Sequence, residues 1–229
     1  MATAQWWIVA IGEPILVTAL VGLLVQGGYR ACYSFTVYLM AVLVPDVMSI
    51  AWPERFHTWE FWMLKEIVHN LLKFAIALEL AIRTFREFPG ARATARTVVF
   101  LVVLLSLAGV LSVPPRHAEL QDLASQLHPR ILNGTIWLFT ALAALILWYR
   151  LPVESLHKAI LIGFVPYLLI FTIAMNALSS IGWHIHTVAG YAHTGAYFAL
   201  LCYWTYAAWR PQQALVRPAR TTSEVALSA

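Results

Sequence analysis

The chain has 229 residues, of which 61% are hydrophobic and only 11% carry a charge. A soluble domain has about 25% charged residues, so this composition is typical of a membrane protein and argues against a soluble catalytic module. The net charge of +4 comes from arginines between apolar stretches and gives no reason to expect a nucleic-acid partner. The two cysteines, Cys32 and Cys202, indicate neither a disulfide framework nor a CxxC metal site.

Seven apolar segments follow one another, each close to the about 20 residues that a helix needs to cross a bilayer. In chain order they are 5–25, 31–51, 59–82, 97–113, 131–149, 159–178 and 187–209. The predicted fold is therefore all-α, a polytopic integral membrane protein with seven transmembrane helices in one bundle. The bundle would be a single domain over residues 1–210, followed by a disordered tail at 211–229 that is polar.

Basic residues predict the orientation of this bundle. One side holds ten of them: Arg30, Arg83, Arg86, Arg92, Arg96, Arg150, Lys158, Arg210, Arg217 and Arg220. The other side holds three: Arg55, Arg116 and Arg130. The positive-inside rule then places the N-terminus outside and the C-terminal tail in the cytoplasm. We expect a multi-pass protein of a cell membrane, either the plasma membrane or a bacterial inner membrane.

The longest external connection is expected at residues 114–129. Within it, Leu120, Leu123 and Leu127 recur at i, i+3 and i+7. This spacing predicts a short amphipathic helix that lies on the membrane surface.

The third apolar segment carries a polar stripe, which we define as Glu66, His69, Asn70 and Lys73. These residues stand at i, i+3, i+4 and i+7, so they share one helical face. A charge at the bilayer centre costs about 2.5–3.5 kcal/mol on insertion scales, so such a face is expected to point into the bundle. Interhelical hydrogen bonding alone would also use these positions. In the functional interpretation, Glu66 and His69 bind or relay protons, Asn70 orients them and Lys73 supplies the counter-charge.

Other ionisable residues are expected at a similar depth, in the outer half of the bundle. Asp46 and Lys65 occur near the outer ends of sequential segments, which predicts that Asp46 neutralises Lys65. Glu13 and His193 would close the site from the first and last segments. Because water and mutual pairing lower the cost of burying charges, we expect a polar cavity open to the outside.

Nearer the cytoplasmic end, Glu79 precedes Arg83 by four residues, which predicts an ordinary ion pair along one helix face. Three prolines within the apolar segments, Pro14, Pro45 and Pro166, each free a backbone carbonyl and permit a kink.

Histidines raise the question of a metal. Glu66 and His69 have the Glu-x-x-His spacing of di-iron bundles, but that site needs the motif twice and the chain has one copy. His184, His186 and His193 have a spacing that suits zinc or iron, although an interfacial turn also accommodates such histidines. His69 and His193 are candidates for ligating one haem. No cofactor is expected in the leading hypothesis.

The leading functional hypothesis is an outward-open cavity that binds a small polar ligand, an ion or a proton, for sensing or transport. A membrane-embedded metal-dependent enzyme is the alternative, so the sequence leaves enzymatic activity open. A structural subunit of a membrane complex is a third reading, in which the aromatic run at 203–209 packs on a membrane protein partner or on a second copy of the chain. The lipid bilayer is a partner in all three.

Overall fold

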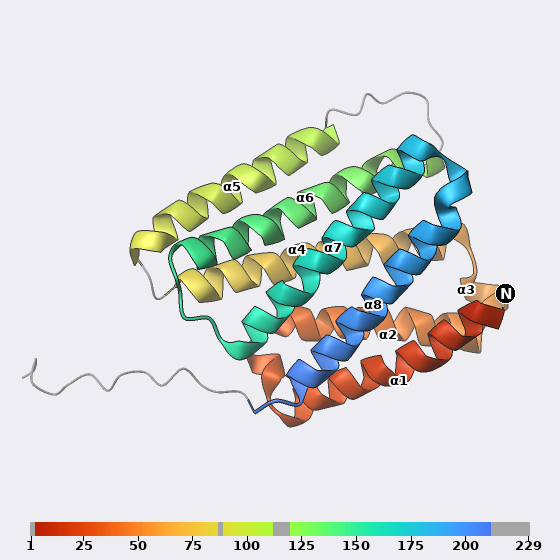
Figure 1. Cartoon of the computed structure of the whole chain (residues 1–229), viewed down its shortest axis with the longest axis horizontal. Helices are drawn as coiled ribbons and strands as arrows, with labels where there is room; N and C mark the ends of the chain where they lie inside the picture. Colours follow the sequence, from red (N-terminus) through yellow and green to blue (C-terminus); the bar gives the residue numbers. More distant parts are fainter. Residues whose placement is uncertain (1–2, 87–88, 112–119, 212–229) are drawn as a thin grey trace, which may run out of the picture.

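The structure is a computed structural model that describes residues 3–86, 89–111 and 120–211 (Figure 1). Over these residues the chain is all-helical, with eight α-helices and two short 3-10 helices, and no strand. The α-helices are α1 (Thr3–Val25), α2 (Tyr33–Ala51), α3 (Pro53–Phe56), α4 (Trp59–Phe85), α5 (Pro89–Leu111), α6 (Leu120–Trp148), α7 (Ser155–Ile181) and α8 (His186–Ala208). The 3-10 helices are η1 (Gly28–Arg30) and η2 (Trp183–Ile185). The all-α fold class is confirmed, and each predicted apolar segment coincides with a long helix.

Six of the described helices form a closed ring, and α5 lies outside it. Around the ring, α1 packs on α2, α2 on α4, α4 on α6, α6 on α7, α7 on α8, and α8 returns to α1. The remaining long helix, α5, packs on α4 and α6, and Figure 1 shows it at the edge of the bundle opposite α1. This ring brings α2, α4, α7 and α8 around one interior.

An aromatic cluster fills one part of this interior. The Phe164 ring of α7 lies 4.7 Å from Trp204 of α8 and 4.9 Å from Phe139 of α6, measured between ring centroids. Phe35 of α2 contacts the same Trp204 ring at 4.9 Å in an edge-on arrangement, a geometry that aromatic quadrupoles favour. Gly163 allows α7 and α8 to approach closely here, because a Cβ at this position would collide with Trp204. The cluster ties four helices of the ring together.

The outward faces of the helices are apolar. Between 66% and 77% of the residue surface is exposed at several large hydrophobic side chains: Leu71, Ile82, Leu105, Trp137, Leu147 and Val188. Monomeric soluble proteins rarely expose apolar surface so widely. In the described part of the chain, two helical stretches are long and apolar enough to cross a membrane, Tyr33–Ala51 and Ser155–Leu178. Shorter apolar stretches occupy α1, α5 and α6.

The predicted surface helix within 114–129 is not a separate element. Residues from Leu120 onward are the first turns of α6, which runs without interruption to Trp148. Pro129 removes one backbone donor from α6 without ending it, which long helices tolerate. Residues 114–119 and nearly all of the predicted tail lie outside the described residues.

Candidate polar cavity

A cavity of about 260 Å³ lies inside the ring of helices. Its lining comes from α2, α4, α7 and α8, namely Tyr38, Val42, Asp46, Lys65, Glu66, His69, Lys73, Tyr167, Leu168, Phe171, His193 and Tyr197. Six of the residues singled out from the sequence are among them: Asp46, Lys65, Glu66, His69, Lys73 and His193. At about 30 Å³ per water molecule, the space is sufficient for several waters or one small polar ligand.

The polar stripe of α4 faces the bundle, as its spacing predicts. His69, Asn70 and Lys73 keep only 7%, 4% and 8% of their surface exposed, while Leu71 on the opposite face is 66% exposed. The amphipathic pattern of α4 therefore places the polar face inward and the apolar face outward. This is the reverse of a soluble helix, whose polar face is the exposed one.

The predicted pair of Asp46 and Lys65 is confirmed. Lys65 Nζ of α4 forms an ion pair with Asp46 Oδ1 of α2, and both side chains are about one-quarter exposed, at 22% and 27%. Glu13 of α1 lies near this pair and interacts electrostatically with both Asp46 and Lys65. Three helices thus bring ionisable groups together at one edge of the cavity.

His69 is connected to α2 through a backbone carbonyl. Its Nε2 lies 2.9 Å from the carbonyl oxygen of Ala41. Ala41 is four residues before Pro45, which lacks the N–H that would normally return to this carbonyl. The Tyr38 ring packs edge-on against the imidazole at 5.9 Å. A single hydrogen bond and deep burial are features of a structural histidine, yet the ring also lines the cavity.

Lys73 is the most deeply placed charge of the stripe. Its Nζ donates to Asn70 Oδ1 at 3.4 Å, so Asn70 orients the lysine, whereas the sequence-based expectation was that it orients Glu66 and His69. Glu66 interacts electrostatically with both Lys73 and His193. Acidic and basic groups therefore face one another across the cavity.

An aromatic wall completes the cavity, and the sequence reading missed it. Tyr167 Oη lies 3.1 Å from His193 Nε2, and the Phe171 ring lies 4.7 Å from the same imidazole. Tyr197 contacts Tyr167 with 6.2 Å between ring centroids. Tyr167 and Phe171 are four residues apart on α7, as are His193 and Tyr197 on α8. That i, i+4 spacing was the available signal, but in a chain so rich in aromatic residues it did not stand out.

The predicted metal-binding histidines are not brought together. His184 lies in η2 and His186 at the start of α8, and both are exposed, whereas His193 is about two turns later and faces the cavity. Among the described residues, no group of three His, Cys, Asp or Glu side chains is arranged to hold a metal ion. His69 and His193, the candidates for haem, line the same cavity, and each has its Nε2 in contact with a protein oxygen.

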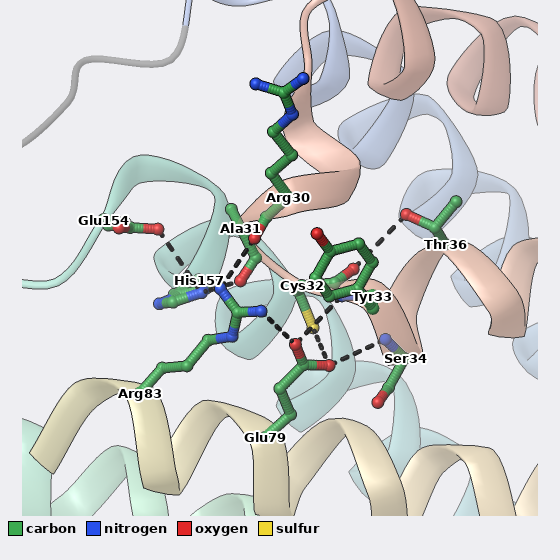
Figure 2. A network of polar contacts seen from close by, with 10 residues as sticks. All are labelled: Arg30, Ala31, Cys32, Tyr33, Ser34, Thr36, Glu79, Arg83, Glu154 and His157. Atoms are coloured by element: carbon green, nitrogen blue, oxygen red, sulfur yellow. Dashed lines mark hydrogen bonds and ion pairs between the residues drawn. The ribbon is translucent and has the colours of Figure 1, made fainter. Parts of the chain in front are cut away.

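A second polar network lies at the other end of α4 (Figure 2). Glu79 accepts hydrogen bonds from the backbone N–H groups of Tyr33 and Ser34, at 3.1 and 2.8 Å, and forms the predicted ion pair with Arg83 at 2.8 Å. The N-cap residue of α2, Cys32, makes no side-chain capping bond of its own. A carboxylate from a different helix therefore caps α2.

The same network reaches α7. His157 is 3% exposed, and its Nε2 lies 2.8 Å from the carbonyl oxygen of Ala31, just before α2. Arg83 also donates to the carbonyl of Arg30 at 2.7 Å. These bonds hold the turn between α1 and α2 against α4 and α7, so this network has the character of a structural clamp.

Comparisons with protein-family models, with curated proteins and with solved structures gave no match. The function is therefore argued from the chemistry of the cavity.

Proposed function

We propose that this chain is a seven-helix integral membrane protein whose cavity binds a small polar ligand, an ion or a proton, for sensing or transport. The main supporting observation is that three residues of the polar stripe, Glu66, His69 and Lys73, line a cavity together with ionisable and aromatic groups from three other helices, and that His69 and Lys73 are buried there. Burying such groups is costly, and they are retained in membrane proteins mainly at ligand, ion and proton sites.

The membrane setting is supported by two features that are independent of the cavity. The outward side chains are apolar around the bundle, and two helices have the length and composition of membrane spans. The arginine asymmetry favours an external N-terminus and a cytoplasmic C-terminus. With that orientation Asp46, Lys65 and His193 all lie toward the outer side, so ligands reach the cavity from outside the cell.

The charges of the cavity suit a reversible binding site. Asp46 and Lys65 neutralise each other, while Glu66 and Lys73 add one acidic and one basic group to the cavity lining, which suits a ligand with its own charge. In a water-poor interior, the loss or gain of one charge changes the field at the others strongly. Binding at Glu66 or Lys73 would therefore change the electric field at groups on all four helices that line the cavity.

The aromatic run at 203–209 gives less support to a purely structural subunit. Trp204 is 2% exposed inside its own bundle, and the Trp209 indole donates to the carbonyl of Thr18 in α1 at 3.1 Å. Tyr206 and Trp209 are 56% and 45% exposed, so only part of the run remains available to a partner.

Ligand-dependent stability tests the proposal. Purified protein in detergent would be unfolded by heat in the presence of sodium, potassium, small carboxylates, small amines and amino acids, each at several pH values. A compound at 100 times its Kd stabilises a protein by about 2.7 kcal/mol. We expect at least one such shift in the wild type, and its loss in Lys73→Met and His69→Gln variants that keep the helical circular dichroism. Failure of every compound and every pH to shift the transition would contradict a binding function.

A further inference from the structure

We propose that Pro45 is a positioning residue that holds His69 in one tautomer, with the proton on Nε2, so that Nδ1 becomes the proton-accepting atom of the cavity. This inference deepens the proposed function and rests on it for its biological meaning. The sequence analysis noted that this proline frees a backbone carbonyl and permits a kink, and the structure shows which side chain meets that carbonyl.

The argument begins with the backbone of α2. In an α-helix the carbonyl of residue i accepts from the N–H of residue i+4. Pro45 has no N–H, so the carbonyl of Ala41 loses its regular donor within α2. A carbonyl buried in an apolar surrounding without a donor is costly, and another group must supply one.

His69 supplies that donor from α4. The distance of 2.9 Å between Nε2 and the Ala41 oxygen is that of an ordinary N–H···O bond. Because a carbonyl oxygen can only accept, Nε2 must carry a hydrogen. A neutral imidazole has one N–H, so Nδ1 is then an unprotonated nitrogen with a free lone pair.

This arrangement suits a site that takes up and releases protons. A proton that binds to Nδ1 leaves the Nε2–H bond to Ala41 in place, so the ring does not need to turn. His193 is different, because its Nε2 faces a tyrosine hydroxyl that can either donate or accept, which leaves the tautomer of His193 unspecified.

Protonation of His69 would change its electrostatic interactions with the ionisable groups around it. Those that face the same cavity are Asp46 and Tyr38 from α2, Lys65, Glu66 and Lys73 from α4, Tyr167 from α7, and His193 and Tyr197 from α8. Glu66 favours the charged ring, while Lys65 and Lys73 oppose it. A charge gained at His69 therefore alters the balance between these neighbours.

Nitrogen NMR of the imidazole rings tests the inference. The ring nitrogens of 15N-histidine-labelled protein distinguish the two neutral tautomers and the protonated ring, and the His69→Gln variant identifies which signals belong to His69. We expect His69 in the wild type to be entirely the Nε2–H tautomer above the pH at which the ring loses its charge. On acidification, Nδ1 should be the nitrogen that gains the proton.

Two proline variants separate positioning from general helix effects. In Pro45→Ala the new N–H returns to Ala41, so the pure Nε2–H signal of His69 should be lost and replaced by a mixture of tautomers. Pro14→Ala, the matched change in α1, should leave the His69 signals as in the wild type. An Nδ1–H tautomer in the wild type, or an unchanged His69 spectrum in a folded Pro45→Ala variant, would overturn the proposal.

If Pro45→Ala does not fold, the wild-type spectrum still tests the proposal, because an Nδ1–H tautomer of His69 would overturn it. These spectra need no added ligand. A result that contradicts the tautomer of His69 is therefore distinguishable from a result in which no compound stabilises the protein.

Discussion

The carboxylate of Glu79 gives a quantitative prediction for the stability of the bundle. Replacing it with alanine removes the acceptor for two backbone N–H groups at the start of α2 and the partner of Arg83. The side chain of Glu79 is 16% exposed, so water only partly replaces these contacts. No cap remains, since Cys32 makes no side-chain capping bond.

The magnitude follows from the individual contacts. A hydrogen bond to a charged group contributes about 1.5–3 kcal/mol, and loss of a helix N-cap costs about 0.5–2 kcal/mol. The ion pair with Arg83, whose side chain is 33% exposed, adds at most about 1 kcal/mol. The contributions do not add in full, because the two hydrogen bonds share one carboxylate and water can partly replace it as the acceptor for the two N–H groups. We therefore expect Glu79→Ala to lower the free energy of unfolding by about 3 kcal/mol.

Matched variants separate the cap from the ion pair. Glu79→Gln keeps one acceptor oxygen and should cost about half as much as Glu79→Ala, while Arg83→Met should cost no more than about 1 kcal/mol. Denaturant-induced unfolding in detergent, followed by circular dichroism, measures all three. If Glu79→Ala changed stability by less than about 0.5 kcal/mol, or if Arg83→Met cost as much as Glu79→Ala, the capping argument would be refuted.

Two further predictions concern packing and charge pairing. Asp46→Asn alone should destabilise the protein by about 1–3 kcal/mol more than Asp46→Asn combined with Lys65→Met, because the single change leaves a partly buried ammonium unpaired. A double-mutant cycle of unfolding free energies measures this difference. Additive effects of the two changes would show that Asp46 and Lys65 do not stabilise the protein as a pair. Gly163→Ala should lower the free energy of unfolding by about 1–3 kcal/mol, because the new Cβ would lie 2.7 Å from Leu200 Cδ1 and closer still to Trp204. Gly190→Ala is the control and should not destabilise the protein, because the space around Gly190 is open. Equal unfolding midpoints for the two variants would contradict the close packing of α7 and α8.

Much of the helical framework follows from the sequence, because it depends on local patterns. The length of each apolar segment predicts a long helix, and the spacing of Glu66, His69 and Lys73 predicts which face of α4 turns inward. The Asp46–Lys65 pair was predictable for a related reason: sequential antiparallel helices bring residues of equal depth together.

The features that could not be predicted depend on how helices are rotated and aligned against one another. The bond between His69 and Ala41 requires a register between α2 and α4 that no local pattern specifies. Glu79 caps a helix whose first residues lie 45 and 46 positions earlier in the chain. The histidine spacing at 184–193 suggested a metal site, but the spacing of residues in the sequence does not determine the direction in which each ring points.

The central claim is that an apolar bundle encloses a polar cavity that is open to the outside, and cysteine accessibility tests it most directly. Single cysteines at Phe171, which lines the cavity, and at Ile173, which is 59% exposed on the apolar face of the same helix, are compared in a Cys32→Ser, Cys202→Ser background. A charged, membrane-impermeant thiol reagent is added to the outside of intact cells. Because thiols react as thiolates in water, Phe171→Cys should be modified at least tenfold faster than Ile173→Cys. The account would be contradicted if the two variants reacted at equal rates or if Ile173→Cys reacted faster. It would also be contradicted if Phe171→Cys were modified only after the cells are opened.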